Sequence, residues 1–309
     1  MTRSVVFAYH DVGVRCLSVL LARGVDVPLV VTHEDDPDET IWFGSVAATA
    51  RRHDVPVVTP ASAKDPELGS RIAAIGPDFI FSFYYRKMIP ESVLRLARRG
   101  ALNMHGSLLP RYRGRSPVNW AIVNGEEETG VSLHHMTVRA DAGAIVGQQA
   151  VPILPDDVAL DVFRKVTCAA ERLLHAILPS LIDGSAIATP QVEAMATTFG
   201  GRTPEDGRIE WRRSAAEVHN LVRAVAPPYP GAFTSLRGDT VFVHRTVRVP
   251  TAAHRATPLH LHGDGGRCFA VCGDGETVRL VEAAREGSPF DLAALARAIE
   301  GRPLPLGAA

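Results

Sequence analysis

The sequence is organised around the segment 103–114, which reads Asn103-Met104-His105-Gly106-Ser107-Leu108-Leu109-Pro110-Arg111-Tyr112-Arg113-Gly114. The apolar pair Ala101-Leu102 precedes it, and glycine and proline within it end any strand. Side chains two positions apart on a strand share one face, so a strand over 101–105 would present Asn103 and His105 together at its carboxyl end. Asn103 offers an amide, and His105 can hold or release a proton near neutral pH.

A carboxylate follows in the turn Arg139-Ala140-Asp141-Ala142-Gly143, between predicted strands at Val131–Thr137 and Ile145–Val151. An Asn, a His and an Asp on converging segments can polarise a carbonyl and stabilise the oxyanion that forms on attack. The same residues could instead support only the local structure. The sequence alone therefore leaves a catalytic and a structural interpretation open for Asn103, His105 and Asp141.

The segment 103–114, taken with Asp141, resembles the signature of the folate-dependent formyltransferases, a family that includes methionyl-tRNA, glycinamide-ribonucleotide and nucleotide-sugar enzymes. The resemblance implies transfer of a formyl group from 10-formyltetrahydrofolate to a primary amine, without a metal. In this hypothesis Asn103 and protonated His105 stabilise the oxyanion, and His105 then donates a proton to the leaving folate nitrogen. Asp141 holds the imidazole and raises its pKa. The family's folate contacts correspond here to Lys87, Met88, Ile89, Arg115, Thr137, Val138, Arg139 and Ala140.

Two segments favour a sugar amine as the acceptor, because His33–Val46 and Tyr112–Trp120 resemble the nucleotide-sugar enzymes. Phe81–Arg86 and Arg139–Val146 are most similar to the formyltransferase part of the bifunctional polymyxin-resistance enzyme. That part formylates UDP-4-amino-4-deoxy-L-arabinose in lipid A modification. The likeness runs through about residue 235, and no sequence remains for the second, NAD-dependent half of that enzyme. We therefore expect a stand-alone formyltransferase or part of a longer protein, with Arg202 and Tyr229 as candidate contacts to the sugar nucleotide.

Composition argues against nucleic acid as a partner. The chain of 309 residues carries a net charge of −1, and from residue 205 onward 13 arginines face 12 acidic residues. A domain that grips a tRNA backbone should be visibly basic. Two alternatives remain open: a methionyl-tRNA formyltransferase, and a catalytically silent folate- or nucleotide-binding protein. The sequence also leaves a homo-oligomer open.

Location is predicted from the absence of targeting signals. The amino terminus lacks a signal-peptide pattern, no run approaches the roughly 18 apolar residues of a membrane span, and the four cysteines are scattered. These features predict a cytoplasmic protein with reduced thiols and no membrane insertion.

The first 200 residues predict a Rossmann-like catalytic domain of class α/β. Short apolar runs alternate with helical patterns, which is typical of a parallel sheet. The predicted strands are Val5–Tyr9, Val27–Thr32, Val55–Val58 and Phe79–Phe83. The turn after the first strand, His10-Asp11-Val12-Gly13, is not GxGxxG, so a dinucleotide site is disfavoured. Ligands of such sheets bind beyond the carboxyl ends of the strands, where Asn103 and His105 would lie.

Residues 201–309 predict a small OB-like β domain after the turn-rich segment 199–207. Its pattern gives a helix at Ala215–Val225, short strands at Thr240–Val249, Arg267–Cys272 and Thr277–Ala283, and a closing helix at Pro289–Ile299. Two groups of histidines stand outside the signature. One or both of His134 and His135 should be structural, because neighbours on a strand face opposite ways. We expect His254, His260 and His262 to lie on the surface without a metal.

Overall fold

The computed structural model describes residues 1–249 and 259–306. Contacts divide the chain into two compact units. The first comprises Met1–Pro117, Glu128–Pro152 and Arg164–Gly200, and the second comprises Val118–Glu127, Ile153–Phe163 and Gly201–Ala309. The division predicted at residue 200 stays a prediction, since the second unit also takes in two earlier segments.

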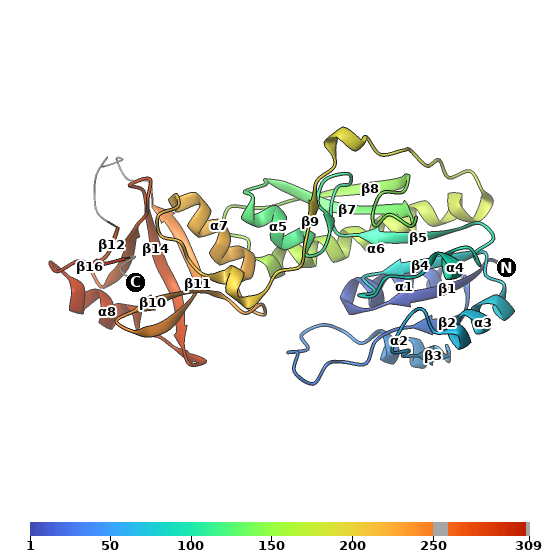
Figure 1. Ribbon diagram of the computed structural model, residues 1–309, viewed down its shortest axis with the longest axis horizontal. Coiled ribbons are helices and arrows are strands. Elements are labelled where there is room, and N and C mark those ends of the chain that lie inside the picture. The colour runs from blue at the N-terminus through green and yellow to red at the C-terminus, as the bar shows by residue number, and fades with distance from the viewer. Residues whose placement is uncertain (250–258, 307–309) are drawn as a thin grey trace. The chain divides into compact units, whose positions relative to one another are not determined.

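A seven-stranded sheet forms the centre of the first unit, in the order β3-β2-β1-β4-β5-β7-β8 (Figure 1). Its strands are β1 (Arg3–Ala8), β2 (Asp26–Val31), β3 (Val57–Val58), β4 (Phe79–Phe83), β5 (Gly100–His105), β7 (Glu128–His135) and β8 (Ile145–Pro152). The strands from β3 to β5 are parallel, which confirms the predicted Rossmann-like sheet. The sheet continues beyond the prediction, because β7 runs antiparallel to β5, and β8 antiparallel to β7.

Helices connect the parallel strands. They are α1 (His10–Ala22), α2 (Val46–Arg52), α3 (Pro66–Ile75) and α4 (Glu91–Leu94), and the unit also holds α5 (Pro117–Val123) and α6 (Ala159–Asp183) in part. Local sequence explains the bounds of α3: Asp65 caps its first turn, Pro66 occupies a first-turn position, and Gly76 ends it in the left-handed conformation. Every residue of β4 is buried, as expected for a parallel strand covered on both faces.

The antiparallel pairing of β5 with β7 decides which side chains meet at the sheet end. Asn103 lies opposite His134, and His105 lies opposite Ser132. Directly opposed residues of an antiparallel pair point to the same face. His134 therefore shares the face of Asn103 and His105, whereas His135 lies opposite Leu102 on the other face.

The second unit contains an antiparallel sheet in the order β10-β11-β14-β13-β12-β16. Its strands are β10 (Ala232–Leu236), β11 (Asp239–Val249), β12 (His260–Asp264), β13 (Arg267–Val271), β14 (Thr277–Arg285), β15 (Ser288–Pro289) and β16 (Leu304–Pro305). Helix α7 (Ala215–Val225) packs on β11, and α8 (Leu292–Ile299) packs on β12 and β13. This curled sheet confirms the predicted small β domain. Short elements β6 (Arg113–Gly114), η1 (Glu193–Met195), β9 (Thr198–Phe199) and η2 (Pro204–Gly207) complete the described fold.

Among the residues that the structure describes, no helix combines the length and apolar character that a membrane span requires.

Candidate active site

The three predicted catalytic residues converge at the end of the first unit's sheet. Strand β5 presents Asn103 and His105, and the turn between β7 and β8 presents Asp141 to both of them. The Asp141 Oδ1 atom lies 3.5 Å from Asn103 Nδ2 and 3.6 Å from His105 Nδ1. Asp141 adopts a positive φ of 54°, a conformation that Asp tolerates better than most residues. The structure therefore places an amide, an imidazole and a carboxylate around one point.

His134 is a fourth member of this cluster that the sequence analysis did not single out. Its Nε2 lies 3.5 Å from Asp141 Oδ1 and 3.2 Å from Asn103 Nδ2. Its Nδ1 lies 2.9 Å from the carbonyl oxygen of His135, which accepts a hydrogen bond from Nδ1–H. The alternation argument allowed one of the two histidines to face the site. Only the antiparallel register shows that it is His134.

Two opposing effects set the ionisation of Asp141. Burial alone would raise the pKa of its carboxyl group, but His105, His134 and the backbone N–H of Gly114 outweigh burial and hold the pKa well below its usual range. The Gly114 N–H donates to Asp141 Oδ2 at 2.9 Å. Asp141 is therefore a carboxylate across the physiological pH range.

The protonation of His105 differs from the expectation. Asp141 raises the pKa of His105, as predicted, but the net pKa is lowered, because burial outweighs the effects of Asp141 and the Tyr112 carbonyl. The ring is 6% exposed. Its Nε2 donates to the Tyr112 carbonyl oxygen at 2.7 Å, which leaves Nδ1 facing Asp141. Protonation of His105 would thus place its second proton on Nδ1, against the carboxylate.

The loop after His105 is fixed by buried hydrogen bonds. Ser132 Oγ donates to the Ser107 carbonyl at 2.6 Å and accepts from the Leu109 N–H at 3.0 Å. Gln148 on β8 donates to Ser132 Oγ at 2.8 Å and to the Leu109 carbonyl at 2.9 Å. At Gly106 a Cβ atom would lie 2.1 Å from Tyr84 Oη, so any larger residue would displace the Tyr84 side chain. The loop is therefore held as a rigid support for His105.

Two of the segments predicted to contact folate are next to one apolar cluster. Ile89 is buried in this cluster, which also contains Phe7 and Val93, and Met136, next to Thr137, packs against it. Met88 and Val138 are 63% and 70% exposed, and Lys87, Thr137, Arg139 and Ala140 are also exposed. Arg115 is exposed too, and its backbone N–H donates to the Phe199 carbonyl at 3.0 Å.

The two candidate contacts to a sugar nucleotide, Arg202 and Tyr229, lie in the second unit, next to consecutive residues of α5. The Arg202 guanidinium lies 4.6 Å from the centre of the Trp120 ring, and its buried Nε has no hydrogen-bond partner among the described residues. Burial raises the pKa of Tyr229 to about 12, and a hydrogen bond with Asn119 opposes this shift. These contacts bring Arg202 and Tyr229 to one helix of the second unit.

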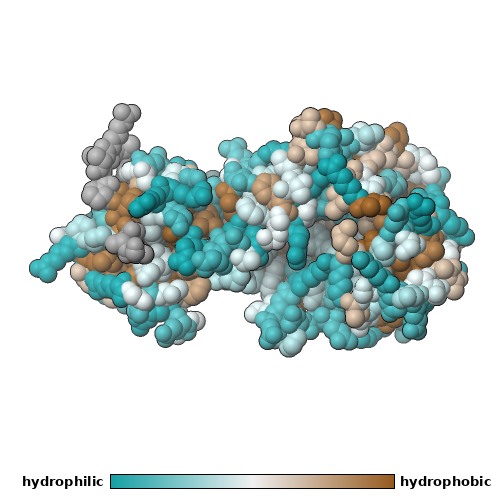
Figure 2. Space-filling view, viewed as in Figure 1, coloured by the Kyte–Doolittle hydropathy of each residue, from teal (hydrophilic) through white to brown (hydrophobic). Residues whose placement is uncertain are grey.

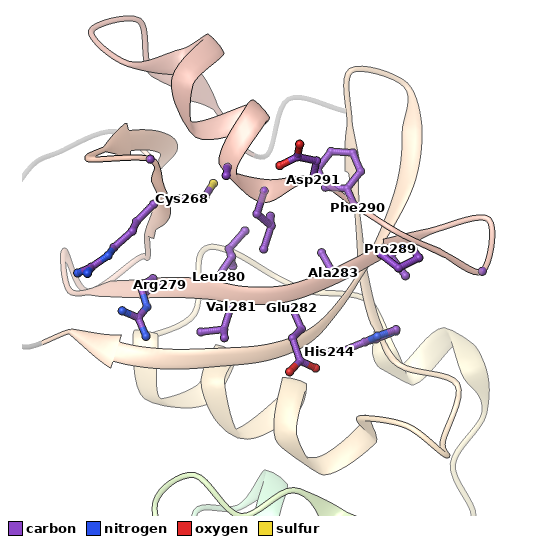
Figure 3. Close-up of a pocket in the computed structure, with 16 residues that line it drawn as sticks. His244, Cys268, Arg279, Leu280, Val281, Glu282, Ala283, Pro289, Phe290 and Asp291 are labelled. Carbon is purple, nitrogen blue, oxygen red and sulfur yellow. The ribbon is translucent and has the colours of Figure 1, made fainter.

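A groove of about 780 Å³ lies along β14 and the start of α8 in the second unit (Figure 3). His244, Arg279, Glu282 and Phe290 are among its lining residues, and no predicted site residue is. In residues 1–249 and 259–306, no group of three or more His, Cys, Asp and Glu side chains is arranged to hold a metal. His260 and His262 lie on β12, and His254 falls outside the described residues.

Comparison with known proteins identifies the family of this chain. Residues 15–178 match the formyl transferase family, and residues 202–297 match the formyl transferase C-terminal domain.

Solved structures with the same fold include an N-formyltransferase from Helicobacter canadensis in complex with folinic acid and dTDP-3-aminofucose. It is 19% identical with a TM-score of 0.74, over 94% of this chain and 100% of that one. WlaRD, a sugar 3N-formyltransferase solved with dTDP and 5-N-formyl-THF, is 18% identical with a TM-score of 0.73, over 93% and 99% of the two chains. A sugar N-formyltransferase from Shewanella sp. FDAARGOS_354 is 17% identical with a TM-score of 0.63, over 81% and 99%. With more than half of its length matched by the first family and the C-terminal domain following in order, the chain belongs to the formyl transferase family and is a formyltransferase.

Proposed function

We propose that this formyltransferase transfers a formyl group from 10-formyltetrahydrofolate to the amine of a nucleotide-linked amino sugar. The convergence of Asn103, His105 and Asp141 at the end of β5 carries this proposal. Such a set can both bind a developing oxyanion and exchange a proton, which are the two requirements of acyl transfer to an amine. It also argues against a catalytically silent binding protein.

Asn103 supplies the neutral donor in this mechanism. The distances from its Nδ2 to His134 and Asp141 are 3.2 and 3.5 Å, at the long end of hydrogen-bond range. One N–H can therefore turn toward the oxygen on which negative charge develops when the amine adds to the formyl carbon. His134 and Asp141 hold the amide in its starting orientation.

His105 handles the proton at Nδ1. The amine loses a proton after it adds to the formyl carbon, and the departing folate nitrogen gains one. The lowered pKa of His105 allows a neutral ring near pH 7, which can accept a proton on Nδ1. Asp141, held as a carboxylate, then stabilises the imidazolium until the ring gives up the proton. These roles explain why a buried histidine faces a buried carboxylate.

The folate supplies the transferable formyl group, and the residues present fit its ring system. Tyr85 packs against the apolar cluster that contains Ile89, and its buried Oη has no hydrogen-bond partner among the described residues. A flat heterocycle with polar edges suits such a site, with an apolar cluster and a buried hydroxyl. We assign the folate to Lys87, Met88, Ile89, Arg115 and the segment 137–140.

For the acceptor, sequence resemblance favours the 4-amine of UDP-4-amino-4-deoxy-L-arabinose, which would place the enzyme in lipid A modification and polymyxin resistance. A second candidate is a dTDP-linked 3-amino sugar, because the Helicobacter canadensis enzyme was solved with dTDP-3-aminofucose. Arg202 suits a diphosphate in either case. Its Nη2 donates to the Asp206 carbonyl oxygen, and its Nε has no hydrogen-bond partner among the described residues. Tyr229 remains the second assigned contact.

The decisive assay offers three acceptors side by side with 10-formyltetrahydrofolate as donor: UDP-4-amino-4-deoxy-L-arabinose, dTDP-3-aminofucose and methionyl-tRNA. We expect mass spectrometry to detect an N-formylated sugar and no formylated tRNA. Turnover of tRNA alone would refute the sugar acceptor but leave the formyltransferase chemistry standing. Salt gives a second criterion, because binding of a diphosphate weakens less steeply with ionic strength than binding of many tRNA phosphates.

A further inference from the structure

Gln191 contacts two parts of the candidate site with one side chain. Its Nε2 donates to the carbonyl oxygens of Asp141 and Gly143, at 2.7 Å each. Its Oε1 accepts from the guanidinium of Arg113, at 2.8 Å from Nη2 and 3.1 Å from Nε. The donor end of the amide thus holds the Asp141 turn, and the acceptor end holds the loop that follows His105.

Arg113 makes this contact consequential, because its guanidinium is buried. The residue is 2% exposed, and besides Gln191 it pairs with Glu193, whose carboxylate oxygens lie 3.0 and 3.2 Å from Nη1. A buried charge must be paired and hydrogen-bonded to be tolerated. Glu193 also pairs with Arg139 of the Asp141 turn.

The segment 191–199, which we call the strap, makes further contacts with the loop that follows His105. The Thr197 side chain accepts from the Tyr112 N–H at 2.8 Å, and the Thr197 carbonyl accepts from the Arg113 N–H at 2.9 Å. The Tyr112 and Phe199 rings stack with centres 5.1 Å apart. The Tyr112 carbonyl accepts the hydrogen bond of His105 Nε2. The strap therefore supports the backbone partner of His105 as well as the turn of Asp141.

No residue of the strap is buried. Val192 and Met195 are each 59% exposed, and Figure 2 shows hydrophobic side chains on the outer surface of this part of the chain. Apart from the Phe199 ring, the strap contacts the site through the polar side chains of Gln191, Glu193 and Thr197, which hydrogen-bond to the segments 112–113 and 141–143. Such a distribution is typical of a segment selected for its polar contacts and not for core packing.

We propose that Gln191 is a positioning residue, which fixes the Asp141 turn against the His105 loop so that the carboxylate and the imidazole keep their relative positions. The proposal rests on the proposed function where it concerns rate. Glutamine suits the place because its amide is both donor and acceptor, whereas glutamate would turn an acceptor toward two carbonyl oxygens. A shift of about 1 Å at a reacting centre can cost about a hundredfold in rate.

The test compares Gln191→Glu, which keeps an acceptor for Arg113, with Gln191→Met, which removes both contacts without adding charge. Gln149→Met on β8 serves as the matched control. We expect both Gln191 variants to lower kcat about 10- to 100-fold, with KM for the acceptor within about threefold and Tm within a few degrees. The control should keep its kcat. Unchanged kcat in both Gln191 variants would overturn the catalytic part of the proposal.

A second readout does not depend on turnover. The amide resonance of Gly114 reports the bond from its N–H to Asp141 Oδ2. Loosening the turn should shift this resonance and move its titration to higher pH, because a weaker bond raises the pKa of Asp141. An unchanged Gly114 resonance in both variants would overturn the positioning itself. If the wild-type protein formylates no acceptor, the proposed function fails, and the Gly114 titration still decides whether Gln191 positions Asp141.

Discussion

His105 and His219, one in each unit, are both nearly buried, but their surroundings differ in one respect. In the second unit, His219 Nδ1 lies 2.9 Å from Thr246 Oγ1, and Nε2 lies 2.9 Å from the Pro155 carbonyl. Both nitrogens of a neutral ring are thus satisfied, with Nε2–H donating and Nδ1 accepting. Among the described residues, His105 has a close partner only at Nε2, while Nδ1 faces a carboxylate at 3.6 Å.

The difference shows which feature separates a structural histidine from a catalytic candidate. Burial lowers the pKa of both rings, so neither burial nor the direction of the pKa shift distinguishes them. The two rings differ in the protonation state in which both ring nitrogens have hydrogen-bond partners. Both ring nitrogens of His219 have hydrogen-bond partners when the ring is neutral, whereas Nδ1 of His105 can donate to Asp141 only when the ring is protonated. His105 can therefore bind and release a proton at Nδ1, where the Asp141 carboxylate stabilises the charged ring.

The largest effect should come from His105→Ala. We expect formyl transfer to fall about a hundred- to a thousandfold or more, because a charge-stabilising group and a proton carrier are lost together. Tm should fall by less than in the control below, because only one close hydrogen bond is lost, from His105 Nε2 to the Tyr112 carbonyl oxygen. His219→Ala is the matched control: it leaves the Thr246 hydroxyl and the Pro155 carbonyl unpaired, at about 1–3 kcal/mol each. That variant should lose several degrees of Tm and keep its kcat, and the opposite pattern would contradict the comparison.

Gly143→Ala should damage the surroundings of His105 without touching His219. A Cβ atom at residue 143 would lie 1.9 Å from the His135 carbonyl oxygen, so the Asp141 turn must move. A displacement of about 1 Å predicts a loss of about a hundredfold in kcat. Gly69→Ala in α3 is the control, because its Cβ would meet nothing within 4 Å. Normal turnover of Gly143→Ala would show that the turn need not be held so tightly.

Asp141→Asn should remove what distinguishes the two histidines electrostatically. Burial then acts on His105 without the opposing carboxylate, so the pKa of His105 falls further and the imidazolium forms only at lower pH. We expect kcat to fall about 10- to 100-fold and its pH optimum to move to lower pH. A pH–rate profile that overlays the wild type would assign Asp141 a purely structural role.

Much of the first unit could be predicted because its signals are local. The run Phe79–Phe83 carries its own strand pattern, and the structure gives β4 these bounds. Asn103 and His105 were predicted to share a face from strand geometry alone. Asp141 was predicted from its place in the turn 139–143 together with the family resemblance, and the structure brings it within 3.6 Å of both.

The features of the site that could not be predicted from the sequence depend on pairing between distant segments. The contribution of His134 depends on an antiparallel register that no single strand pattern specifies. Gln191 lies 50 residues from Asp141 in a segment with little secondary structure, so no periodicity marks it. Asp141 raises the pKa of His105 as predicted, but the net pKa is lowered, because the sequence identifies the carboxylate and does not show how deeply the ring is buried. Burial and register are properties of the assembled sheet.

The smallest expected effect concerns the pH dependence of stability. The pKa of His219 is lowered in the folded protein, chiefly by burial, while Asp156 and the Pro155 carbonyl oppose the shift and Arg223 and Arg248 add to it. The unfolded chain therefore binds the proton more tightly, with a pKa of about 6.5. The stability that neutral His219 contributes is complete above that pH and is lost as the pH falls toward the lower folded value. Because His219→Ala lacks this contribution, the Tm gap between wild type and variant should narrow when the pH is lowered from about 7.5 to about 5. Thermal unfolding at both pH values measures the gap, and a gap that widens at low pH would mean that His219 is charged in the folded protein.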